Sequence, residues 1–118
     1  MTLEQFLTRL NANPETIQFS DTISVIDQYY DFTPSKFVNG DLINEANQNN
    51  GSCKIIAFSQ LNKLNKNNTL HCFGDYYRQD VLKHPENTDH QNIRNLMTHG
   101  PESVEFTHAA LALKNTSV

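Results

Sequence analysis

The chain has 118 residues, the usual size of one domain and enough to bury one modest hydrophobic core without disulfide or metal staples. Nine Lys and Arg residues against thirteen Asp and Glu residues give a net charge of -4. A nucleic-acid-binding surface needs an excess of cations, so we expect no nucleic-acid partner. We expect one domain over residues 1–118, with frayed residues after about 113.

No segment approaches the roughly 20 apolar residues that span a bilayer, so we expect no membrane partner. The N-terminus lacks the basic start and apolar run of a secretory signal, so Sec-type export is not expected. Cys53 and Cys72 fall in partly apolar segments that are predicted to be helical, where free buried thiols are common. We expect reduced thiols, which fits a cytoplasmic location.

Residues 2–11 carry apolar side chains at the spacing of one helical face, and Thr2 with Gln5 forms a capping-box pattern. The apolar positions are Leu3, Phe6, Leu7 and Leu10. This pattern predicts a first amphipathic helix. Residues 16–19 alternate too briefly to separate a short strand from a first helical turn.

A second helix is predicted to begin at a Ser20 or Asp21 cap and to end at Thr33-Pro34, because the residue before proline avoids helical dihedrals. Its inward stripe is Ile23, Ile26 and Tyr30. Residues 37–51 are polar and contain two glycines, which favours a long connection with one irregular helical turn over residues 42–46.

A third helix is predicted from a Ser52 cap, with a polar stop over residues 62–68. Its inward positions are Ile55, Ile56, Phe58, Leu61 and Leu64. A fourth helix is predicted from Asn68 or Thr69 up to Pro85, with Leu70, Phe73, Tyr77 and Val81 along one side. Gly74 in its middle costs about 1 kcal/mol relative to Ala and indicates a closely packed neighbour.

A fifth helix is predicted to start at a Thr88 or Asp89 cap and to end before Gly100-Pro101. It buries Ile93, Leu96 and Met97. Residues 103–107 alternate with period two and predict an edge strand paired with residues 16–19. The fold class is therefore mainly α, with about five helices and at most a small two-stranded β element, or α+β if the strands form.

Two polar strings, residues 39–53 and 88–94, lie next to the predicted helices and gather side chains that donate, accept, titrate or coordinate. We expect the two strings to fold onto each other and to form one shared hydrophilic site.

Four blocks of the sequence resemble the signature of the HopJ type III effector family, in family order. They are Asn39-Gly40, residues 49–54 (NNGSCK), residues 73–78 (FGDYYR) and residues 88–94 (TDHQNIR). The resemblance extends from about residue 31 to residue 106. It implies a bacterial effector-type protein, cytoplasmic or exported through a type III secretion system, and it supplies no catalytic residues.

One enzymatic hypothesis uses Cys53, which follows Gly51-Ser52 at a predicted helix start where amides and the helix dipole lower a thiol pKa. His90 and Asp89 would then be the base and its orienting acid in a hydrolase or transferase. The structural alternative places Cys53 under a loop and uses Asp89 as a helix cap.

A weaker hypothesis is a metal site, because His71 and Asp75 are four residues apart on the predicted fourth helix. His90 or Cys72 would be the third ligand. The closely spaced pairs of typical zinc sites are not present, so we assign neither a metal nor a cofactor.

The hypothesis that we prefer is recognition of a protein or a small polar ligand by an interaction module rather than an enzyme. The contacts would come from aromatic and guanidinium side chains, which combine apolar area with directional hydrogen bonds. These are Tyr76, Tyr77, Arg78 and Arg94, flanked by Asn39, Asn49, Gln91 and Asn92. The predicted binding residues are Asn39, Asn49, Tyr77, Arg78, Asp89, His90, Asn92 and Arg94. The structural alternative places Tyr77 in the core and uses the asparagines and Arg94 to fasten the long connection to the fifth helix.

Overall fold

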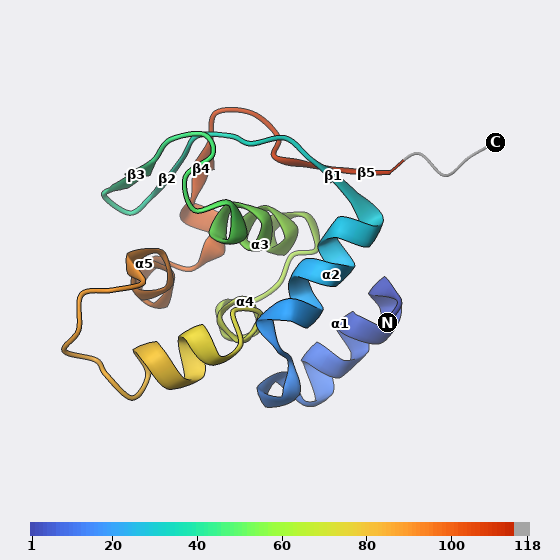
Figure 1. Ribbon diagram of the computed structural model, residues 1–118, viewed down its shortest axis with the longest axis horizontal. Helices are drawn as coiled ribbons and strands as arrows, with labels where there is room; N and C mark the ends of the chain where they lie inside the picture. The colour runs from blue at the N-terminus through green and yellow to red at the C-terminus, as the bar shows by residue number, and fades with distance from the viewer. Residues whose placement is uncertain (115–118) are drawn as a thin grey trace.

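The computed structural model describes residues 1–114 (Figure 1). Helix α1 spans Leu3–Ala12 and begins with the predicted capping box. The Thr2 hydroxyl accepts a hydrogen bond from the Gln5 N–H at 3.0 Å, and the Gln5 side chain accepts one from the Thr2 N–H at 2.9 Å. Phe6 and Leu10 are fully buried, as the helical spacing requires.

A short 3-10 helix, η1 (Pro14–Thr16), leads directly into helix α2 (Phe19–Tyr29). Residues 16–19 are therefore not a strand, because a proline at the first helical position favours a helical turn. Helix α2 starts earlier than predicted, since Asp21 accepts a hydrogen bond from the Gln18 N–H at 2.9 Å. It ends at Tyr29, before the predicted stop, because Tyr30–Phe32 forms strand β1.

The predicted long connection is wrong, because residues 37–44 form a hairpin of β2 (Phe37–Asn39) and β3 (Leu42–Asn44). Gly40 and Asp41 make the two-residue turn, in which Gly40 has a φ of +65°. Hairpin turns of the primed types require such positive φ values, and glycine adopts them without steric cost. The strands were missed because three residues are too few for a recognisable alternation.

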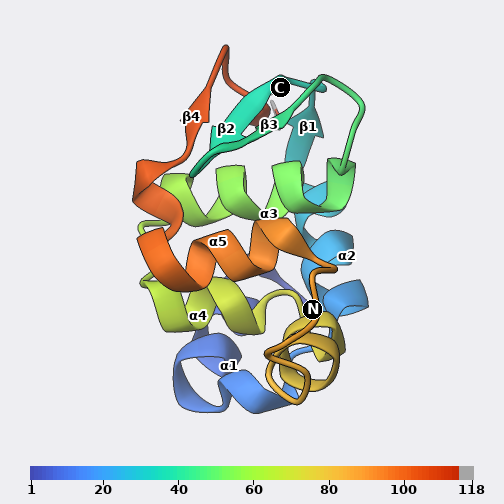
Figure 2. The same cartoon turned by 90° about the vertical axis from the view of Figure 1, so that its left-hand side faces the viewer.

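Helix α3 (Asn50–Leu61) runs through the middle of the molecule (Figures 1 and 2). Helices α2 and α4 pack against it, and in Figure 2 the hairpin lies above it and α5 below it. Because α3 is covered on several sides, its buried residues are not confined to one face of the helix, and five of the six are consecutive. They are Cys53, Ile55, Ile56, Ala57, Phe58 and Ser59. The Phe58 ring packs edge-on against the rings of Phe6 and Tyr30, each at 5.8 Å between centroids.

The predicted fourth helix is split into α4 (Lys66–His71) and a π-helix, η2 (Tyr76–Val81). The break lies at Gly74, whose φ is +61°. A Cβ atom at Gly74 would lie 2.5 Å from the backbone nitrogen of Phe19. The closely packed neighbour that the glycine indicated is therefore the start of α2.

Helix α5 (Gln91–His99) is followed by a 3-10 helix, η3 (Pro101–Ser103), and strands β4 (Glu105–Phe106) and β5 (Leu111–Leu113). Strand β4 pairs antiparallel with β2, which gives a three-stranded sheet in the order β3-β2-β4. Strand β5 pairs with β1 in a second, two-stranded sheet. The predicted partner of residues 103–107 is thus wrong, and the fold is α+β with five α-helices in the described residues.

Lys114 is still held, since its N–H donates to the Tyr29 carbonyl at 3.0 Å. The predicted fraying after residue 113 otherwise falls on residues 115–118, which lie outside the described residues. Within residues 1–114, none of the helices has the length and apolar character needed to traverse a lipid bilayer.

Candidate functional site

Helices α3 and α5 begin on the same side of the molecule (Figure 2). Their first turns line one pocket of about 540 Å³ together with parts of α2, β3 and η2. The lining residues are Phe19, Leu42, Asn49, Gly51, Ser52, Phe73, Tyr76, His90, Gln91, Asn92 and Ile93. The pocket therefore combines polar helix starts with an aromatic wall.

The residues that precede the two helices have the same unusual backbone conformation. Asn49 has a φ of 54° before α3, and His90 has a φ of 52° before α5, both in the left-handed region. Neither side chain accepts a hydrogen bond from its helix, and neither first turn contains an acidic residue. The first-turn amides of both helices are therefore not closed by a side-chain cap.

Beneath the pocket, asparagine side chains join the hairpin to α5. Asn92 Nδ2 donates to Asn44 Oδ1 at 2.9 Å, and Asn92 Oδ1 accepts from Asn39 Nδ2 at 3.0 Å. Asn49 Nδ2 donates to Asn44 Oδ1 at 2.7 Å, and Asn95 Nδ2 donates to the Asn39 carbonyl at 2.8 Å. The structure thus brings the two polar strings together, as the sequence led us to expect.

His90 connects the start of α5 to the π-helix. Its Nε2 atom lies 3.1 Å from Asp80 Oδ2 and 3.9 Å from Asp89 Oδ2. Its ring lies 5.4 Å from the Tyr76 ring. His90 therefore forms one rim of the pocket, and its nearest carboxylate, from Asp80, is a residue that the sequence did not identify.

Arg94 and Asp89, both predicted binding residues, form a clamp outside the pocket. The guanidinium donates to the Asp89 carboxylate at 2.8 Å, to the Asp89 carbonyl at 2.6 Å and to the His84 carbonyl at 3.1 Å. This hydrogen bonding by Arg94 lowers the pKa of Asp89. The clamp fastens the loop before α5, and not the segment over residues 37–51 that the structural alternative had paired with Arg94.

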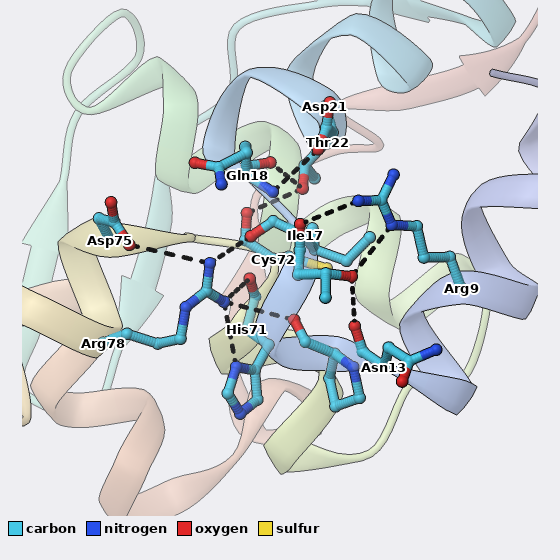
Figure 3. A network of polar contacts seen from close by, with 12 residues as sticks. Arg9, Asn13, Ile17, Gln18, Asp21, Thr22, His71, Cys72, Asp75 and Arg78 are labelled. Carbon is cyan, nitrogen blue, oxygen red and sulfur yellow. Dashed lines mark hydrogen bonds and ion pairs between the residues drawn. The ribbon is translucent and has the colours of Figure 1, made fainter.

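Arg78 and Tyr77 also lie away from the pocket. The Arg78 guanidinium donates to the carbonyls of Ile17 and, at 3.3 Å, of Pro14, which ties η2 to the segment between α1 and α2 (Figure 3). Tyr77 is buried, and its ring lies 5.3 Å from the His71 ring. Burial raises the pKa of Tyr77. Both residues therefore stabilise the fold around the π-helix.

The proposed metal pair is separated by the break at Gly74, so His71 and Asp75 do not share one helical face. Arg78 lies between them, with Nη1 at 3.2 Å from His71 Nδ1 and Nη2 at 3.9 Å from Asp75 Oδ1 (Figure 3). Burial and the charge of Arg78 lower the pKa of His71. Residues 1–114 contain no group of three His, Cys, Asp or Glu side chains that could hold a metal ion.

Cys53 is 1% exposed, does not line the pocket, and lies with Sγ at 3.7 Å from the Ser35 carbonyl. Burial raises the pKa of Cys53, and burial raises the pKa of Cys72 to about 12. Reactive cysteines have lowered pKa values and accessible sulfur atoms. Cys53 instead has a raised pKa and a buried sulfur atom, because α3 begins at Asn50 and directs this side chain inward, under the loop that contains Ser35. These features do not support Cys53 as a nucleophile.

Of the predicted binding residues, the pocket contains Asn49, His90 and Asn92, while Asn39 lies in the network beneath it. Of the aromatic wall formed by Phe19, Phe73 and Tyr76, the sequence had indicated only Tyr76 as a contact for recognition. Phe73 lies with Tyr76 in the block FGDYYR, which is the signal that could have pointed to it.

Comparison with known proteins places this geometry in a family. The family model described as HopJ type III effector protein matches residues 3–111. A crystal structure of VPA0580, described as a protein of unknown function, is 57% identical and covers 97% of this chain and 95% of that chain, with a TM-score of 0.94. None of the curated proteins searched matches the chain. Because the family match includes both helix starts and the whole pocket lining, the chain belongs to the HopJ type III effector family.

Proposed function

We propose that this protein is a binding module that takes a small ligand with an anionic group into the pocket between α3 and α5. One observation carries the proposal: two helix starts without side-chain caps line the same pocket. The family description supports an effector role that begins with export through a type III system.

The electrostatic support comes from the backbone. The first N–H groups of a helix have no partner within it, and the helix dipole places a partial positive charge at that end. Two such ends on one pocket favour a carboxylate or phosphate group, which accepts several hydrogen bonds at once. The first turns of α3 and α5 contain no acidic residue. The nearest carboxylates at the start of α5 already have partners, since Asp80 contacts His90 and Asp89 pairs with Arg94.

The other walls define the rest of the ligand. Phe19, Phe73 and Tyr76 contribute rings, and Ile93 contributes an aliphatic side chain. Sites of this kind bind the body of a ligand by apolar contact and orient it through a few polar groups. The expected ligand is therefore small and amphipathic, with its anionic group directed at the helix starts.

Titration with inorganic phosphate and with acetate, followed by amide NMR at constant ionic strength, tests the proposal. We expect the amide resonances of Gly51, Ser52 and Gln91 to shift together and to saturate. The variant Gln91→Glu adds a carboxylate to the first turn of α5, and it should weaken phosphate binding roughly fivefold to tenfold through charge repulsion.

Gln5→Glu is the matched control, because it makes the same change in the first turn of α1, away from the pocket. It should leave phosphate binding unchanged. The proposal fails if the pocket amides do not respond to either anion, or if both variants weaken binding equally.

A further inference from the structure

A second recess lies beside the pocket, on the other side of Tyr76. It has a volume of about 320 Å³ and is formed by the start of α2 and by residues on and next to η2. The lining residues are Gln18, Phe19, Ser20, Asp75, Tyr76 and Asp80. We call it the acidic aromatic recess.

The aromatic part of the recess is accessible. Tyr76 is 46% exposed, and the Phe19 ring meets the Tyr76 ring edge-on at 5.0 Å between centroids and 84° between planes. This contact holds Tyr76 in place without covering it. An exposed ring of this kind can contact a cation over its face.

The charges at the recess are negative. The Asp75 and Asp80 side chains are 66% and 49% exposed, and they flank Tyr76 along the chain. No Lys or Arg is among the six lining residues. The nearby Arg78 guanidinium is directed to the carbonyls of Ile17 and Pro14 and lies only within 3.9 Å of Asp75, so it neutralises that carboxylate weakly.

From this charge complementarity we propose that the acidic aromatic recess docks an arginine or lysine side chain from a basic segment of a partner protein. The cationic head group lies against Tyr76, and its N–H groups donate to Asp75 and to the second carboxylate oxygen of Asp80, whose Oδ2 lies 3.1 Å from His90 Nε2. Arginine fits best, because its planar guanidinium stacks on rings and forms paired hydrogen bonds with carboxylates. The net charge of -4 favours the approach of a basic segment.

This surface is separate from the anion-binding pocket, although Phe19 and Tyr76 contribute to both. Asp75 lines only the recess, and Gln91 lines only the pocket. Substitutions at these two positions therefore distinguish the two proposals.

The test uses the whole chain and a short capped peptide of alternating arginine and glycine, titrated by amide NMR. We expect the amide resonances of Tyr76, Asp75 and Ser20 to shift with the peptide, and we expect affinity to fall as salt is raised. Asp75→Asn should weaken binding roughly twofold to fivefold, and Tyr76→Leu should do the same.

Glu4→Gln is the matched control, because it removes one exposed carboxylate from α1 and changes the net charge by the same amount as Asp75→Asn. It should leave peptide affinity unchanged. Asp75 is exposed, so Asp75→Asn keeps the test valid even if Tyr76→Leu lowers stability. The proposal is overturned if the glutamate version of the peptide binds equally well, if the recess resonances do not move, or if Glu4→Gln weakens binding as much as Asp75→Asn. Equal affinity for free arginine amide would also overturn it, since the recess would then bind a small cation rather than a protein segment.

Discussion

The helix starts are of two kinds. We call the starts of α1 and α2 closed, because side chains there accept hydrogen bonds from backbone N–H groups, and the starts of α3 and α5 open, because side chains there do not. Thr2 and Gln5 close α1 with reciprocal hydrogen bonds, and Asp21 accepts from the Gln18 N–H at α2. The starts of α3 and α5 follow left-handed residues and have no such bonds. Helix α4 is capped as well, since the Asn65 side chain accepts from the Asn68 N–H at 2.7 Å. The same fold thus caps three helices for stability and leaves two facing a pocket, which is where binding energy can be gained from a ligand.

The closed start of α2 depends on Gly74, and breaking that contact should have the largest effect. Gly74→Ala adds a Cβ at 2.5 Å from the Phe19 nitrogen and requires alanine to adopt a φ of +61°. We expect a loss of about 3 kcal/mol or more in the free energy of unfolding, measured by urea denaturation. Gly51→Ala is the control, because its added Cβ meets only the tip of the Phe19 ring at 3.0 Å. Equal stability of the two variants would contradict this explanation.

The open starts are held by the asparagine network, so Asn92→Ala should have the next largest effect. It removes the three buried hydrogen bonds that the Asn92 side chain makes with Asn39 and Asn44. Asn39 then keeps only its bond to the Asn92 carbonyl, and Asn44 keeps its bonds with Asn49 and with the Leu42 carbonyl. We expect a loss of about 2 to 3 kcal/mol by urea denaturation. Asn95→Ala removes one hydrogen bond to the Asn39 carbonyl and should cost only about 1 kcal/mol. If the two variants are equally stable, the network does not hold the helix starts.

A direct test of the comparison exchanges one residue at each kind of helix start. Thr2→Ala removes the cap of α1 and should lower the free energy of unfolding by about 1 kcal/mol. His90→Gly relieves a φ of 52° and loses a partly buried contact with Asp80, so stability should change by less than about 0.5 kcal/mol. Thermal unfolding of both variants measures the difference. A large loss for His90→Gly would mean that α5 is capped after all.

The smallest expected effect concerns pH. The hydrogen bond from Arg94 lowers the pKa of Asp89 in the folded state below its ordinary value of 3.8. The resulting stabilisation is therefore fully present above the unfolded-state pKa and is lost as the pH falls through the folded-state pKa. Asp89→Asn should flatten the acidic limb of a stability–pH profile. An unchanged acidic limb would show that the clamp does not depend on the charge of Asp89.

Local sequence signals predicted α1 fully, because its cap and apolar stripe are contained in ten residues. They failed where contacts between distant segments decide the structure. The strands β1, β2 and β4 are two or three residues long and pair with partners far along the chain or across a two-residue turn. The split at Gly74 likewise depends on the approach of α2, which no local pattern reveals.

The same division applies to the candidate site. Asn49, His90 and Asn92 were identified because dense polar strings next to helix starts indicate a site from residue type alone. Phe19 was assigned to an ambiguous segment, and Asp80 lay within the predicted fourth helix without being singled out. Both reach the site only through tertiary packing and the π-helix, so periodicity could not identify them.

The network of Asn39, Asn44 and Asn92 has one more consequence. Carboxamide groups neither gain nor lose a proton between acid and neutral conditions, and mobile ions do not shield their dipole-based hydrogen bonds as they shield ion pairs. The joint between the hairpin and α5 should therefore keep its shape when a protein passes between surroundings of different acidity and salinity.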